Sequence, residues 1–144
     1  MTRFAGYAAL FDLPDAGGDV IARGAFARSL ATSGGRVPLL IQHRGGVIAG
    51  EIETLAEDER GLRVIARLGR HAAGRSARRL LKAGKLNGLS FGYRTTRAGR
   101  AGPHRRLDEV ELVEVSLVAR PMQPRARVHK IEEDDGEIGD QNGE

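Results

Sequence analysis

The chain has 144 residues, 40% of them hydrophobic, which is enough for one domain with a moderate core. It contains no cysteine, and this excludes disulfide bonds, thiolate metal sites and a cysteine nucleophile. No apolar run has the length of a membrane span and the first residues lack the apolar region of a signal peptide, so we expect a soluble, intracellular protein with no membrane partner.

Charge is unevenly distributed along the chain. Residues 1–130 contain all 23 Lys and Arg residues and 12 of the 19 Asp and Glu residues, which gives a net charge of +11. Residues 131–144 contain the other seven acidic residues and no basic residue. We therefore predict one folded domain, 1–130, and an acidic, disordered tail, 131–144. The basic body suggests an acidic partner, but aromatic residues, at 4%, are too few for a platform on which nucleic-acid bases stack.

The N-terminal half has the pattern of short strands around one short helix. A loosely alternating segment, 3–11, predicts a first strand, and a loop with Pro14 follows it. Further on, the patterns predict a short extended piece (19–23), a short helix (24–30), a buried strand (37–42) that ends at His43, and its hairpin partner (47–55).

The C-terminal half adds the clearest helix and the longest strand. Residues 71–85 have Ala and Leu at helical spacing, and Gly84 predicts the end of this helix. The patterns also predict strands at 62–68, 86–94 and 107–119 and a loop at 98–103. Many short strands with two helices predict an α+β fold, a small and mostly antiparallel β-barrel or sheet flanked by helices.

Ser90 lies in the string Gly88-Leu-Ser90-Phe-Gly92. In a strand, residues two apart share a face, so the face that carries the Ser90 hydroxyl is predicted to be otherwise bare backbone that a peptide can approach. The string also matches the nucleophile elbow of α/β-hydrolases. That motif needs a strand before the serine and a helix after it, whereas here the order is reversed, so we disfavour the elbow.

A base and an acid are available to activate this serine. His43 ends an apolar strand, whereas His71, His104 and His129 lie at a helix start, in a loop and at the junction with the tail. On the longest predicted strand, Glu114 interrupts an otherwise apolar face formed by Val110, Leu112, Ser116 and Val118. A carboxylate there must be paired, either with an imidazole that it orients or with one of the many arginines. Glu109 and Glu111 lie on the opposite face and are expected to be solvated.

Five segments, in this order, resemble the prohead proteases of tailed bacteriophages, capsid-maturation serine proteases related in fold to herpesvirus assemblin. The segments are FAGYAALF (4–11), DVIARGAFARSL (19–30), VPLLIQH (37–43), LKAGKLNGLSFGY (81–93) and EVELVEVSLVARP (109–121). The resemblance implies an assemblin-like fold and the catalytic residues His43 as base, Ser90 as nucleophile and Glu114 as the acid, with Glu111 as the alternative acid. It implies no cofactor and no metal. Arg44 stands where the family often has an acidic residue, which leaves the substrate preference open.

The implied function is that of a serine endopeptidase that cleaves scaffold and major capsid protein. It would act in the host cytoplasm, inside the immature procapsid of a phage, a prophage or a gene-transfer particle. Its expected partners are the major capsid protein and its scaffold segment, and self-cleavage and a homo-oligomer stay open. The alternative is a non-catalytic capsid-assembly factor that binds an acidic scaffold through its basic surface. Nucleic acid is not expected as a partner, because only the net charge supports it.

Overall fold

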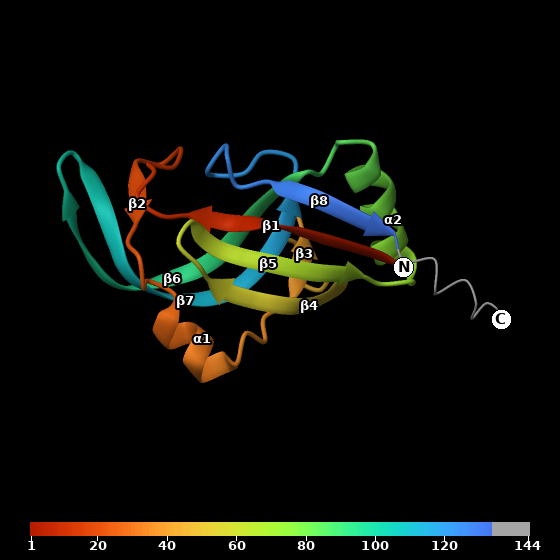
Figure 1. Ribbon diagram of the computed structural model, residues 1–144, viewed down its shortest axis with the longest axis horizontal. Coiled ribbons are helices and arrows are strands. Elements are labelled where there is room, and N and C mark those ends of the chain that lie inside the picture. Colours follow the sequence, from red (N-terminus) through yellow and green to blue (C-terminus); the bar gives the residue numbers. More distant parts are fainter. Residues whose placement is uncertain (134–144) are drawn as a thin grey trace.

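The computed structural model of the protein describes residues 1–133, which form one curled eight-stranded sheet with two helices (Figure 1). The helices are α1 (Ala27–Ser33) and α2 (Ala72–Lys82). The strands are β1 (Thr2–Leu10), β2 (Asp19–Ile21), β3 (Leu39–Ile41), β4 (Ile48–Glu57), β5 (Gly61–Leu68), β6 (Gly88–Ala101), β7 (His104–Val118) and β8 (Val128–Glu133). The predicted α+β class and the mostly antiparallel sheet are confirmed, with parallel pairing only where β7 meets β2 and β3 among the described strands.

The sheet curls so that its two edge strands approach each other: the start of β6 lies beside the segment just before β8. The strand order is β2-β7-β3-β4-β5-β1-β8, and β6 pairs with β7 along the edge opposite β2 and β3. At the other end of the sheet, Gly88 of β6 forms a bridge with Arg127, just before β8. The N–H of Leu89 also donates to the carbonyl of Ala126 at 2.8 Å. These contacts close the sheet into a half-barrel around the apolar core.

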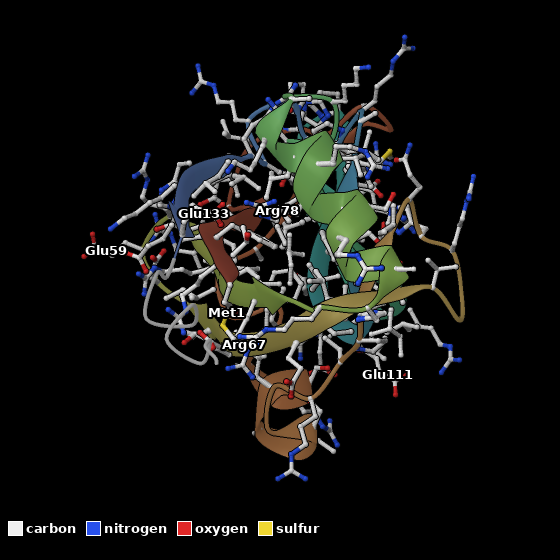
Figure 2. All side chains as sticks on the ribbon, turned by 90° about the vertical axis from the view of Figure 1, so that its right-hand side faces the viewer. Met1, Glu59, Arg67, Arg78, Glu111 and Glu133 are labelled. Carbon is white, nitrogen blue, oxygen red and sulfur yellow. The ribbon has the colours of Figure 1, made fainter. Side chains whose placement is uncertain are left out.

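The core explains why these segments form strands and helices. Phe4, Leu89, Val115 and Leu117 are at most 1% exposed and point into the half-barrel. Helix α2 covers one end of it (Figure 2) and buries Ala77 and Leu81, as its helical spacing predicts. Full burial of each large aliphatic side chain of this kind contributes about 1.5–3 kcal/mol.

Most predicted bounds are shifted by a few residues, as for the helix predicted at 24–30 and found at Ala27–Ser33, and two differences are larger. The predicted loop 98–103 is mostly strand, because β6 continues to Ala101 and the β6–β7 hairpin turns at Gly102, where φ is +60°. This long hairpin extends from the body beside β2 (Figure 1). None of the helices formed by residues 1–133 is long and apolar enough to cross a membrane.

The second difference concerns the predicted tail, whose first three residues, Ile131–Glu133, belong to β8. Their pairing with β1 continues to Thr2, which lies opposite Glu133. Helix α2 then holds the carboxylate of Glu133 through Arg78, at 2.6 Å, and Lys82, at 2.7 Å (Figure 2). The charge pattern predicts Glu133 to be part of the tail, but it is the ion-paired end of a strand. The rest of the predicted tail, 134–144, lies outside the described residues.

Candidate active site

Strand β7 lies between the two segments that carry Ser90 and His43. On one edge, β6 places Ser90 directly opposite Ser116 of β7. On the other edge, β3 runs parallel to β7 with Leu40 beside Ser116, and β3 ends one residue later, at Ile41. His43 therefore follows β3 at the same level of the sheet as Ser90. His43 and Ser90, which are far apart in the sequence, are thus placed on either side of β7, because β7 pairs with both segments.

His43 lies in an unusual backbone turn. Gln42 and His43 have φ angles of +52° and +59°, and the N–H of Arg44 donates to the carbonyl of Ile41 at 3.0 Å. Residues other than glycine rarely adopt this left-handed region, which costs of the order of 1–3 kcal/mol for each residue and is common at functional sites. Strand β7 supports the turn, because the N–H of Gln42 donates to the carbonyl of Leu117 at 2.9 Å. The side-chain oxygen of Gln42 also accepts the N–H of Ala119 at 3.1 Å.

This turn brings the His43 ring onto the Glu114 carboxylate, with Nδ1 at 2.5 Å from Oε2. The carboxylate is almost buried, with 10% of the side chain exposed, whereas 42% of the His43 side chain is exposed. The second oxygen, Oε1, accepts the hydroxyl of Ser116 at 2.7 Å. Both oxygens of this buried carboxylate thus have a hydrogen-bond partner, as its burial requires. When Nδ1 carries the ring proton, Nε2 is left as a proton acceptor.

Ser90 lies on the neighbouring strand with its side chain on the same face as Ser116, because residues that are opposite in an antiparallel pair share a face. It is only 5% exposed, and its hydroxyl makes no hydrogen bond with another of residues 1–133, His43 included. A buried hydroxyl without such a bond is uncommon. Bonds between a nucleophile and its base are often long before substrate binds, so the arrangement is compatible with a serine that reacts with a ligand.

Gly88 and Gly92 are glycines because other groups occupy the space of a side chain there, and not because the strand face is bare as predicted. A Cβ at position 92 would lie 2.5 Å from Oε2 of Glu114, and a Cβ at position 88 would lie 2.6 Å from the Pro121 ring. The face around Ser90 is therefore covered by Glu114 and Pro121 and is not bare backbone. Glycine fits at position 92 because the Glu114 carboxylate lies where a Cβ would be.

The predicted strand face of Glu114 is also wrong in part. Successive residues Gly92 and Tyr93 of β6 pair with Glu114 and Leu112 of β7, so Val113 is an extra residue in a β-bulge. The bulge changes which residues share a face. Four apolar side chains of β7 on the two sides of the bulge join one core, namely Val110, Leu112, Val115 and Leu117. Glu114 and Ser116 lie together on the other face, as the alternation predicts, but the pattern did not single out Ser116 as a hydrogen-bond partner of Glu114.

The other candidate acids and histidines lie away from Glu114 and Ser90. The side chain of Glu111 is 55% exposed and pairs with Arg94 at 3.3 Å, and Glu109 accepts the hydroxyl of Thr96 at 2.9 Å. The three other histidines have separate contacts: His71 with the carbonyl of Ile48, His104 with the carbonyl of Gly18 and His129 with the ring of Tyr7.

Neither of two other features suggests a competing site. Within residues 1–133, no group of three or more His, Asp or Glu side chains is placed to hold a metal ion. A hollow of about 450 Å³ lies between α1 and β7 and is lined by Arg28, Glu109 and Glu111, among others. It does not reach His43, Ser90 or Glu114. The chemistry of the described chain therefore points to the His43–Glu114 contact and to Ser90 beside it.

Comparisons with known proteins agree with this fold. The sequence model of a family described as caudovirus prohead serine protease matches residues 1–140. The prohead protease of enterobacteria phage HK97 is 34% identical over 92 residues, which cover 62% of this chain and 41% of that protein. The chain thus matches about two fifths of the length of this curated relative.

Solved structures of viral proteases have a similar fold. The capsid assembly protease of bacteriophage T4 has a TM-score of 0.66 at 11% identity, over 81% of this chain and 80% of that chain. A KSHV protease in complex with a hexapeptide phosphonate inhibitor has a TM-score of 0.58 at 15% identity, over 96% and 68%. The varicella-zoster virus protease has a TM-score of 0.56 at 16% identity, over 94% and 66%. These likenesses confirm the predicted assemblin-like fold.

Proposed function

Because this chain belongs to the family of caudovirus prohead serine proteases, we propose that it is a serine endopeptidase that cleaves scaffold and major capsid protein during procapsid maturation. The observation that carries the proposal is the contact between Nδ1 of His43 and the buried Glu114 carboxylate, with Ser90 on the adjacent strand. The proposed partners are the capsid precursor and its scaffold segment. The proposed place of action is the interior of an immature procapsid in the host cell.

In the proposed mechanism, Ser90 is the nucleophile and His43 is the general base. Nε2 of His43 takes the proton from Oγ of Ser90 as this oxygen attacks the peptide carbonyl. The same nitrogen then gives the proton to the leaving amine, and a water molecule hydrolyses the acyl-enzyme by the reverse sequence of proton transfers. Backbone N–H groups stabilise the oxyanion that forms at each step.

Glu114 supports this chemistry through the other ring nitrogen of His43. Its Oε2 accepts the proton on Nδ1, which keeps Nε2 free to act as the base. The carboxylate also stabilises the imidazolium that forms when Nε2 takes the serine proton. Since the carboxylate is almost buried, water screens this attraction weakly. A histidine that had only a structural role at a strand end would not need a buried acid behind it.

The alternative function is a non-catalytic assembly factor that binds an acidic scaffold. Its support is the charge of the described chain, where residues 1–133 carry 23 basic and 14 of the 19 acidic residues, a net charge of +9. Charge of this kind favours association with an acidic partner whether or not the protein is an enzyme. It explains neither the His43–Glu114 contact nor the buried hydroxyl of Ser90, so we favour the protease.

A fluorophosphonate probe tests the proposal, because it forms a covalent bond only with an activated serine. We expect the probe to label the wild-type protein at Ser90 and to leave Ser90→Ala and His43→Ala unlabelled. Two matched controls, Ser76→Ala on α2 and His104→Ala on β7, should be labelled like the wild type. Co-expression with the capsid precursor should give cleaved product only with the wild type and the controls. Cleavage by a folded Ser90→Ala protein would disprove the serine mechanism.

A further inference from the structure

A second serine lies inside the candidate site, and its hydroxyl contacts both the base and the acid. Ser116 of β7 is completely buried. Its Oγ donates a hydrogen bond to Oε1 of Glu114 at 2.7 Å and accepts the backbone N–H of His43 at 3.1 Å. A serine hydroxyl has one proton to donate and lone pairs that accept, so the two bonds use the group in complementary ways. The accepted N–H leaves the hydroxyl proton directed at Glu114.

Each of these bonds fixes something that the proposed reaction needs. The bond from the N–H of His43 fixes the backbone of His43, which has a positive φ. It thereby fixes the point from which the imidazole ring extends. The bond to Oε1 holds one carboxylate oxygen, so that the other oxygen stays on Nδ1 of His43. One hydroxyl therefore sets the position of the base and the orientation of the acid.

We propose that Ser116 is a positioning residue of this site. It keeps the Glu114 carboxylate oriented towards the His43 ring. The proposal rests on the proposed function, because it assigns a role in activating Ser90. Ser116 is not itself the nucleophile, since its hydroxyl is buried and its proton is directed to Glu114. Positioned groups of this kind matter because a small displacement of a catalytic side chain can cost a large factor in rate.

The test is the rate at which the fluorophosphonate probe labels Ser90. The dependence of labelling on probe concentration separates kinact, which reports activation of the serine, from KI, which reports binding of the probe. For Ser116→Ala we expect kinact to fall on the order of 10- to 100-fold, because the acid and the turn both lose their support. KI should stay within about twofold, since Ser116 is buried and cannot reach the probe.

Ser29→Ala is the matched control for the loss of a buried serine beside β7. Ser29 is 9% exposed, and its Oγ accepts the N–H of Leu112 at 2.9 Å, but it contacts neither Glu114 nor His43. Its removal should change the melting temperature about as much as Ser116→Ala does and should leave kinact unchanged. Ser116→Thr keeps the hydroxyl, so it should retain more of kinact than Ser116→Ala. If alanine at 116 prevents folding, Ser116→Cys, whose side chain is slightly larger and whose S–H is a weaker donor, takes its place.

The ring nitrogens of His43 give a second readout that a purely structural role would not change. Nitrogen chemical shifts show which ring nitrogen carries the proton at a pH where the ring is neutral. We expect the proton on Nδ1 in the wild type and a mixture of the two tautomers in Ser116→Ala. A folded Ser116→Ala protein with the kinact and the His43 tautomer of the wild type would overturn the proposal. This result differs from failure of the proposed function, in which Ser90→Ala itself would still be labelled or still cleave.

Discussion

Nδ1 of His43 lies 2.5 Å from Oε2 of Glu114, although 71 positions of the sequence separate the two residues. The contact depends on the parallel pairing of β3 with β7, which ends at Ile41 beside Leu117. From there the turn with positive φ angles brings His43 back over β7 to Glu114. A change at either residue therefore tests the candidate site.

Glu114→Gln should reduce proteolysis strongly, by a factor between tens and about 10⁴. Glutamine has nearly the shape of glutamate, but it cannot stabilise an imidazolium, and its amide can favour the wrong tautomer of His43. Glu111→Gln is the matched control, because Glu111 lies on the same strand and pairs only with Arg94 among the described residues. Cleavage of the capsid precursor by the two purified variants measures the difference. An inactive Glu111→Gln beside an active Glu114→Gln would assign the acid to Glu111.

Much of the fold could be predicted because its elements have strong local patterns. Helix α2, for example, has apolar residues at helical spacing and Gly84, at a φ of +75°, after its end. His43 and Ser90 stood out as candidates because one follows an apolar strand and the other lies between two glycines. These features belong to single segments, and a sequence pattern describes single segments well.

The contacts between segments could not be predicted in this way. One extra residue, Val113, in the bulge of β7 reverses the face of every later residue, and an alternating pattern does not reveal where such an insertion lies. The left-handed turn at Gln42 and His43 contains no glycine, so its local sequence gives no sign of it. The role of Ser116 depends on the position of β7 between β3 and β6, which no local pattern predicts.

Gly92→Ala should lower activity and also cost some stability. The added Cβ would lie 2.5 Å from Oε2 of Glu114, so this almost buried carboxylate must move and its hydrogen bonds are disturbed. Movement of this oxygen separates it from His43, and we expect a loss of activity on the order of 10- to 100-fold. Gly17→Ala is the control, because a Cβ there has only ordinary contacts, at 3.4 Å and beyond. Thermal unfolding and cleavage assays on both variants make the comparison, and full activity of Gly92→Ala would show that Glu114 needs no such space.

The ion pairs of Glu133 should make part of the stability depend on pH. Hydrogen bonds from Arg78, and then from Lys82 and Thr2, lower the pKa of Glu133 to about 2, from a usual value of 4.5. The folded carboxyl thus binds protons more weakly than the unfolded one. Its contribution to stability is complete above about pH 4.5 and is lost as the pH falls from there towards 2. Glu133→Gln should therefore lower the free energy of unfolding at pH 7 and much less at pH 3.

Urea unfolding of wild type and Glu133→Gln at a series of pH values measures this change. Glu132→Gln is the control, because its carboxylate is 50% exposed and its contacts with Arg3 and Lys130 are long, at 3.6 and 3.8 Å. We expect this variant to differ little from the wild type at any pH. A Glu133→Gln deficit that is the same at pH 3 and pH 7 would mean that lost packing, and not charge, causes the destabilisation.

The end of β8 also decides where the chain can be shortened. We propose that residues 134–144 are dispensable for folding, whereas truncation after Lys130 removes Ile131–Glu133, half of β8, together with the ion pairs to α2. Truncation after Lys130 should therefore lower the melting temperature by several degrees, and truncation after Glu133 should leave it unchanged. Differential scanning calorimetry of the two truncated proteins and the full chain gives this comparison. A protein that ends at Glu133 and does not fold would show that residues 134–144 belong to the domain.

The same truncation after Glu133 tests whether the acidic residues of the tail screen the basic body. It removes five carboxylates from a chain whose residues 1–133 carry a net charge of +9. Binding of a fluorescent oligoglutamate peptide should become tighter at low salt, because the tail no longer competes for the basic surface. The two proteins should converge at high salt, where the Debye length falls from about 8 Å at 0.15 M to about 3 Å at 1 M. Weaker binding by the truncated protein would mean instead that the tail is part of the docking surface.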